Sequence, residues 1–78
     1  NYTIVFHTQS GAIKFDNKMR KLKIPCSLRP VPRKLSSSCG ICAILAYGEN
    51  PMSLMEPEIE RIYKDCSDNR YELLYESQ

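Results

Sequence analysis

A continuous apolar run, Ile41-Cys42-Ala43-Ile44-Leu45-Ala46-Tyr47, lies between Gly40 and Gly48 near the middle of the chain. Its length and its flanking glycines favour a buried β-strand, although periodicity alone leaves a short helix open. Side chains alternate between the two faces of a strand, and both alternating sets are apolar here. We expect helices to cover one face, while the other face is either covered by a partner chain or modestly exposed.

The residues before this run predict three elements. Aromatic and β-branched residues at 2–7 indicate a strand, and Thr8 or Ser10 is a suitable cap for a helix after it. That helix should end before Pro25, because the residue preceding a proline is pushed out of the helical region. A short strand is expected at 26–29. The inward positions of the helix are predicted to be Ala12, Phe15, Met19 and Leu22.

The residues after the run predict a second helix and a last strand. Pro57 suits the first turn of a helix. A turn is expected at residues 68–69 and a strand at 71–75. The inward positions of this second helix would be Ile59, Ile62, Tyr63 and Cys66.

The resulting order is β-α-β-β-α-β within 78 residues. This order predicts an α+β fold of the ferredoxin-like kind, in which an antiparallel sheet carries two helices on one face. We expect residues 1–78 to form a single domain, and the other sheet face to be a possible dimer surface.

Composition narrows the classes of function. Eleven basic and nine acidic residues give a net charge of +2, which is too balanced to predict nucleic-acid binding. No membrane span or signal peptide is expected. Cys26 and Cys66 lie in apolar patterns, as reduced core cysteines do, so we expect a cytoplasmic protein with free thiols.

The stretch from Arg33 to Cys42 carries the candidate chemistry. Cys39 should lie exposed where a loop meets the third strand, and we expect it to be the fastest of the four thiols to react. Ser36, Ser37, Ser38 and the Gly40 amide are suited to hydrogen-bond a charged sulfur, and Arg33 and Lys34 add positive potential. Cys39 is therefore predicted to act as a nucleophile or a sulfur carrier.

Two alternatives use both thiols of the C-x-x-C pair. A redox dithiol usually lies at a helix N-terminus, whereas a strand follows Cys39 and directs Cys42 to the opposite face. Three extended residues span roughly 10 Å, too far for a disulfide without a backbone turn. A zinc site usually needs a second ligand pair, so no metal and no cofactor are expected. Cys42 remains a candidate second thiol.

His7 ends the first strand, which is a neighbour of the third strand in the predicted fold. It is a candidate base or hydrogen-bond donor for Cys39, although a solvated or helix-capping histidine is the simpler interpretation. No acidic residue at suitable spacing completes a Cys-His-Asp set, so hydrolysis has little support.

The chain also resembles a small bacterial domain family described as sulfur/selenium carrier-like. The resemblance is carried by Phe6-His7-Thr8, Ile24-Pro25, Pro32-Arg33 and Leu35-Ser36-Ser37-Ser38-Cys39-Gly40. It implies that Cys39 carries sulfur or selenium. It also implies that the domain occurs alone or fused to a sulfurtransferase-type carrier domain in proteins linked to selenium metabolism. The matched motif positions are His7, Pro32, Arg33, Ser36, Ser37, Cys39 and Gly40.

Two hypotheses of function follow. In the first, Cys39 accepts sulfur or selenium from a donor protein and passes it to an acceptor protein. In the second, the domain is a non-catalytic interaction or regulatory module that dimerises through its open sheet face, and fold alone does not choose between them. A small dithiol redox protein that uses Cys39 and Cys42 is a further alternative.

Overall fold

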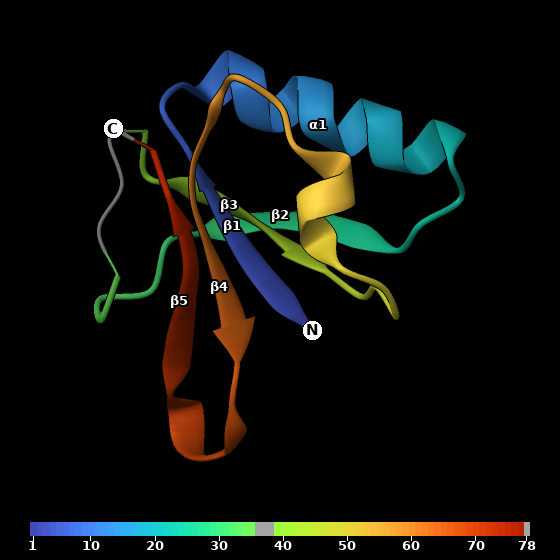
Figure 1. Ribbon diagram of the computed structural model, residues 1–78. Helices are drawn as coiled ribbons and strands as arrows, with labels where there is room; N and C mark the ends of the chain where they lie inside the picture. The colour runs from blue at the N-terminus through green and yellow to red at the C-terminus, as the bar shows by residue number, and fades with distance from the viewer. Residues whose placement is uncertain (36–38, 78) are drawn as a thin grey trace.

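The computed structural model describes residues 1–35 and 39–77. In this part of the chain, five strands form one antiparallel sheet in the order β2-β3-β1-β4-β5, and one α-helix packs on it (Figure 1). The predicted α+β class is therefore confirmed. The elements are β1 (Tyr2–Phe6), α1 (Gln9–Lys21), β2 (Cys26–Pro30), β3 (Ile41–Leu45), η1 (Pro51–Leu54), β4 (Ile59–Asp65), η2 (Ser67–Asn69) and β5 (Tyr71–Glu76).

The hydrophobic core lies between α1 and the central strands of the sheet. Ile4 of β1 is opposite Ala43 of β3 on one side and Ile62 of β4 on the other, so three strands contribute one apolar row. The rings of Phe6 and Phe15 meet at 5.4 Å between centroids, which joins β1 to the helix. The helix buries Ala12, Phe15 and Met19 as predicted, whereas Leu22 is 51 % exposed.

 The inward position predicted for Leu22 is therefore wrong, because this residue follows the last turn of α1 and its side chain faces solvent.

Both ends of α1 follow from local hydrogen bonding. Thr8 caps the helix, since its hydroxyl oxygen accepts a hydrogen bond from the Gly11 amide at 3.0 Å. At the other end Lys23 has a φ of +60°, and the Ile24 amide donates to the Met19 carbonyl at 2.9 Å. This pattern closes the last turn and releases the chain into Pro25 and β2, as the sequence predicts.

The predicted second helix is wrong, because residues 59–65 form strand β4 at the side of β1. Val5 pairs with Arg61 but Phe6 pairs with Ile59, so Glu60 is an extra residue that forms a bulge. The bulge turns Ile59 and Ile62 to the same face, although a regular strand would place them on opposite faces. Their spacing of three residues is therefore typical of a helix but arises here from a strand.

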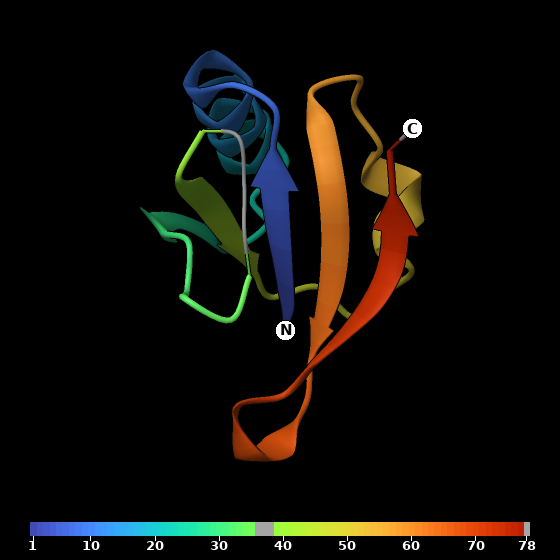
Figure 2. The same cartoon turned by 90° about the vertical axis from the view of Figure 1, so that its left-hand side faces the viewer.

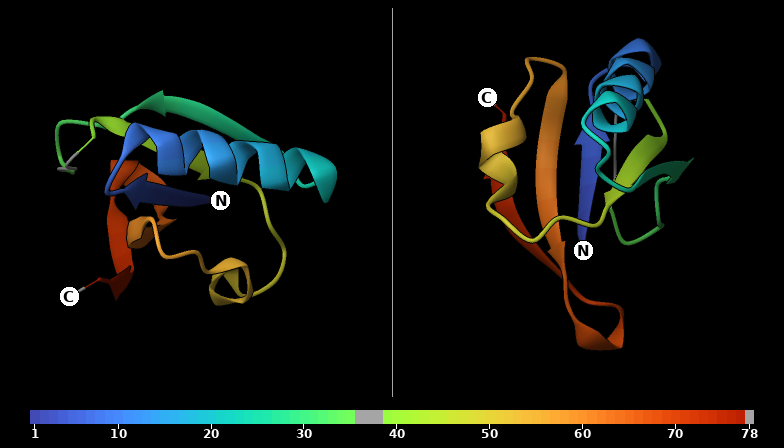
Figure 3. Two further views of the ribbon diagram at one scale, coloured as in Figure 1. Left: turned by 90° about the horizontal axis from the view of Figure 1, so that it is seen from above. Right: turned by 90° about the vertical axis from the view of Figure 1, so that its right-hand side faces the viewer.

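The two-helix ferredoxin-like arrangement is accordingly not what the structure shows. A connection with the short η1 turn runs from β3 to β4 past the N-terminal end of β1 (Figure 3). Pro51 and Leu54 of η1 are buried, so this turn adds to the core although the second helix was expected later in the chain, from Pro57 onward. The last predicted strand is confirmed as β5, which forms the edge of the sheet beside β4. The predicted turn at Asp68 and Asn69 is also confirmed, with both residues at positive φ.

The sheet face opposite α1 is closed at its centre within the chain itself. Val5 and Cys42 are opposite each other in register, and both have no exposed surface. Thr3 is also buried, and its hydroxyl donates to an Asp65 carboxylate oxygen at 2.7 Å. Ile44 is only half-buried. The centre of this face therefore needs no partner chain to cover it, which removes part of the basis for the expected dimer surface.

The segment after β2 links this side of the molecule to the β4–β5 turn. Figure 2 shows this segment leaving β2 and curving away from α1. The Lys34 ammonium donates to the Asn69 carbonyl at 2.7 Å. Lys34 and Leu35 also line a hollow of about 280 Å³ together with Arg70 and Tyr71. This contact holds the first part of the β2–β3 connection against a distant hairpin.

Candidate functional site around Cys39

Cys39 lies at the end of the connection between β2 and β3. The ladder between these strands extends beyond Pro30 and Ile41, because the Val31 amide donates to the Gly40 carbonyl at 3.1 Å. Cys39 is therefore the last residue of the connection before the paired backbone begins. This is the loop–strand junction at which the sequence places it, and Figure 2 shows the junction near the start of α1.

Two hydrogen bonds fix the backbone around Cys39. Its thiol donates to the Ile41 carbonyl with 3.3 Å between sulfur and oxygen. Its carbonyl accepts a hydrogen bond from the Gln9 side chain at 3.4 Å, and Gln9 is the first residue of α1. The cysteine is thus tied to its own strand and to the N-terminus of the helix.

Cys39 is less exposed than the sequence predicts. Its side chain is half-buried and packs against the edge of the core, whereas Cys66 is exposed. Cys66 was expected in the core because of its helical spacing from Ile62, and it instead follows β4 at the start of the turn to β5. Its thiol donates to the Lys64 carbonyl at 3.7 Å.

The other two thiols are poorly suited to react. Burial raises the pKa of Cys26 to about 12, and the neighbouring Asp16 carboxylate adds to the increase. Burial also raises the pKa of Cys42, to which Asp65 contributes a smaller effect. Because the thiolate is the reactive form, the raised pKa values make Cys26 and Cys42 less reactive at neutral pH than ordinary thiols.

The pair Cys39 and Cys42 is not arranged as an active dithiol. Cys42 is completely buried on the face away from α1, and its thiol donates to the Pro30 carbonyl at 3.7 Å. Cys39 packs instead against the core beneath α1. All four cysteines lie in the described part of the chain, and none of them forms a disulfide.

His7 and Cys39 lie at the same end of the sheet. Val5 is opposite Cys42, so the end of β1 continues beside the start of β3. The His7 side chain is exposed, and its backbone amide donates to the Glu58 carbonyl at 2.9 Å. The role of His7 as a base or donor for Cys39 stays a prediction.

The expected anion-stabilising residues are only partly described. Arg33 is exposed, and Lys34 is directed to Asn69 of the β4–β5 turn. Ser36, Ser37 and Ser38 lie outside the described residues. Gly40 adjoins Cys39, as its place in the sequence requires.

Gly40 has a conformation that favours glycine. Its φ is +76°, and a Cβ atom built there meets no other atom within 4 Å. Strain rather than crowding therefore opposes a side chain at this position. We expect Gly40→Ala to lower the free energy of unfolding by about 1 kcal/mol, measured by urea denaturation. Gly48→Ala is the matched control, because Gly48 also has open space but lacks a positive φ, and equal effects of the two substitutions would contradict the expectation.

Sequence reasoning missed two polar contacts near the cysteines. Gln9 reaches Cys39 only because α1 starts above the end of the β2–β3 connection. Asp16 raises the pKa of Cys26 only because α1 packs against β2. Neither residue belongs to a motif, so the sequence carries no local signal for them.

Further features bear on ligands and membranes. Among residues 1–35 and 39–77, no three His, Cys, Asp or Glu side chains form a group that is able to hold a metal ion. No helix in this part of the chain has the length and apolar character needed to cross a membrane.

Fold and site together define a small α+β domain that presents a cysteine at the end of a strand connection. The chain belongs to the family described as "Putative Se/S carrier protein-like", whose model matches residues 1–72. The family resemblance seen in the sequence is thereby confirmed. No curated protein matches the chain, and no solved structure matches it.

Proposed function

We propose that the chain is a sulfur or selenium carrier that holds its cargo on Cys39 and passes it to a partner protein. The observation that carries the proposal is the contrast among the thiols of this family member. The pKa values of Cys26 and Cys42 are raised, whereas the half-buried Cys39 lies in the family motif where the β2–β3 connection meets β3. Cys66 is exposed but lies at the far turn between β4 and β5.

The transfer needs no net oxidation. The Cys39 thiolate attacks the terminal sulfur of a donor persulfide, a new S–S bond forms at Cys39, and the donor leaves as a thiolate. An acceptor thiolate then attacks the same terminal sulfur and releases the Cys39 thiolate. A perselenide follows the same steps with selenium as the transferred atom.

The neighbouring groups receive supporting roles in this proposal. His7 lies at the same end of the sheet and is suited to take the thiol proton. Arg33, the Gly40 amide and the serines at 36–38 are assigned to the terminal anion. The donor or acceptor is a partner protein, for which a sulfurtransferase-type carrier domain is suitable. The free thiols fit a reducing compartment such as the cytoplasm.

Loading of Cys39 tests the proposal directly. The purified chain is incubated with a small-molecule persulfide donor, and the added sulfur is located by peptide mass spectrometry. We expect Cys39→Ser to abolish loading at position 39, because a serine hydroxyl forms no persulfide. Cys66→Ser is the matched control and should load as the wild type does.

The other hypotheses predict different outcomes. Loading of Cys66 in place of Cys39, or of neither, would contradict a carrier role and favour the interaction module. Oxidation that joins Cys39 to Cys42 in native protein would favour the dithiol protein.

A further inference from the structure

β2 is an edge strand, and its outer side carries backbone groups that face no neighbouring strand. The order β2-β3-β1-β4-β5 gives β2 a partner only in β3 among the described residues. The Val31 amide donates to the Gly40 carbonyl, and an antiparallel ladder repeats this direction at every second residue, so the backbone groups of Arg29 also point to β3. The N–H and C=O groups of Leu28 therefore point away from the sheet. Such a free edge is able to pair with a further strand.

A second hollow, of about 280 Å³, lies beside this edge and beside Cys39. The end of β2 and the start of β3 line it, through Leu28, Arg29, Pro30, Gly40 and Ile41. Gly40 directly follows Cys39 in the chain. Leu28, Ile41 and Cys39 all pack against the core beneath α1, so the hollow and the thiol belong to the same face of the sheet.

α1 adds an exposed apolar side chain on the side that carries Gln9. The Gln9 side chain donates to the Cys39 carbonyl, so this side of the helix lies toward the β2–β3 connection. Ile13 is four residues further along and therefore lies one turn away on the same side. It is 52 % exposed, which is unusual for a large apolar side chain of a helix that packs against β2. Ile13 and the hollow thus give the surroundings of Cys39 an apolar character.

The charges near β2 are positive. Arg29 lies on β2, Lys23 and Arg33 lie on the segments that enter and leave it, and all three residues are exposed. Asp16 is the only acid before Glu49 in the sequence, and it is buried. The acids of β4 and β5 are separated from β2 by β3 and β1. The free edge therefore attracts acidic side chains.

We propose that the free edge of β2 docks the partner protein that exchanges cargo with Cys39, through an extended segment of alternating apolar and acidic side chains. The inference rests on the proposed carrier function for its purpose. The segment hydrogen-bonds the outward backbone groups of Leu28, as in other complexes formed by strand addition. Its apolar side chains enter the hollow, and its acidic side chains lie on the opposite face with Arg29, because successive residues of a strand point to opposite faces. A partner that docks in this way brings its own thiol close to Cys39.

A second copy of this chain is a poorer occupant of the same edge. Two copies that pair through β2 bring two basic edges together, and like charges across an interface oppose association. Pro30 also lacks the N–H group that a longer strand pairing needs at the end of β2. A short acidic segment avoids both costs.

A synthetic peptide provides the probe. It has about eight residues, a usual strand length, with valine and glutamate in alternation, and its counterpart has lysine in place of glutamate. Binding is measured by fluorescence anisotropy, and hydrogen exchange of the Leu28 amide is followed by NMR. At a peptide concentration of about nine times Kd, we expect exchange at Leu28 to slow about tenfold, because about one-tenth of the chain remains free. The lysine peptide should bind on the order of tenfold more weakly, since attraction becomes repulsion.

Two pairs of variants locate the binding. Arg29→Glu should remove the preference for the glutamate peptide, whereas Arg70→Glu, at an exposed position before β5, should keep it. Ile13→Ser should weaken binding several-fold, whereas Leu73→Ser is the matched control, because Leu73 is similarly exposed on the opposite edge strand. All four positions are exposed, so the variants are expected to fold.

The remaining outcomes would overturn the proposal. Failure of both peptides to bind, equal binding of both, or binding without protection of the Leu28 amide would remove docking at β2. Protection of Leu28 that rises with the concentration of the chain alone would identify a second copy as the occupant and would contradict the choice of partner.

The docking surface and the carrier function are tested separately. Cys39→Ser should bind the glutamate peptide as the wild type does, because docking does not use the thiol. Persulfide loading of Cys39 without peptide binding would remove the docking surface alone. Peptide binding with protection of Leu28, but with no loading at Cys39, would leave the docking surface standing and remove the carrier function.

Discussion

Replacing Phe15 by alanine is expected to lower the free energy of unfolding by about 3–5 kcal/mol. Phe15 is 1 % exposed, and its ring packs on the Phe6 ring of β1. Removing the ring leaves a cavity and takes away the largest side chain that the helix contributes to the core. A domain of this size has a total stability of the same order, so the variant should be mostly unfolded at room temperature.

Far-ultraviolet circular dichroism with urea denaturation measures this effect. Ile13→Ala is the matched control, because Ile13 is in the same helix but is 52 % exposed. We expect the control to change stability by no more than about 0.5 kcal/mol. A Phe15→Ala variant with wild-type stability would show that α1 does not pack on the sheet as described.

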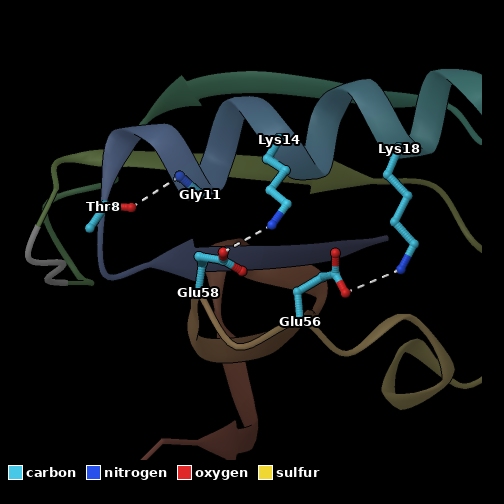
Figure 4. A network of polar contacts seen from close by, with 6 residues as sticks. All are labelled: Thr8, Gly11, Lys14, Lys18, Glu56 and Glu58. Carbon is cyan, nitrogen blue, oxygen red and sulfur yellow. Dashed lines mark hydrogen bonds and ion pairs between the residues drawn. The ribbon is translucent and has the colours of Figure 1, made fainter.

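Replacing Gly11 by valine is expected to lower the free energy of unfolding by about 1–3 kcal/mol or more. A Cβ atom at Gly11 would lie in steric conflict with the Glu58 side chain, whose Cγ atom is 2.8 Å away. Figure 4 shows Gly11 above Glu58, where the Lys14–Glu58 and Lys18–Glu56 ion pairs also join α1 to the segment before β4. The glycine therefore lets the helix approach this segment closely.

The sign of the effect makes the Gly11 prediction specific. In an exposed helix a side chain larger than glycine raises helix propensity, so an isolated α1 would favour the substitution. Asn17→Ala, at an exposed position of the same helix, should be neutral or slightly stabilising under the same urea denaturation. A Gly11→Val variant as stable as this control would contradict the close approach of α1 to Glu58.

Much of the fold could be predicted because the local sequence signals of several segments agree with the elements that these segments form in the complete fold. The strands at β1 and β3 are apolar on both faces, and Thr8 and Pro25 mark the two ends of α1. The local pattern of the β4 residues favours a helix, although these residues form a strand. The bulge at Glu60 gives Ile59 and Ile62 a helical spacing, and the pairing with β1 that creates the bulge is not visible in a local window.

The sequence predicts where the candidate cysteine lies in the chain, but it does not predict which residues surround it in the fold. Gly40 and the apolar run after it place Cys39 at a junction without any knowledge of tertiary structure. The environment of each cysteine depends on the packing of distant elements. Cys66 is exposed because β4 is a strand, and Asp16 raises the pKa of Cys26 because α1 packs against β2.

The central place of β1 has a consequence for how the chain folds. Tyr2 pairs with Lys64, so the first strand finds one of its two partners almost at the other end of the chain. Closing such a long loop costs entropy before any core contact repays it, and sheets with distant pairings fold slowly, on the order of milliseconds to seconds. The β2–β3 and β4–β5 hairpins have local pairings and are suited to form early. We therefore expect folding to be limited by the step at which β1 joins the two hairpins into one sheet.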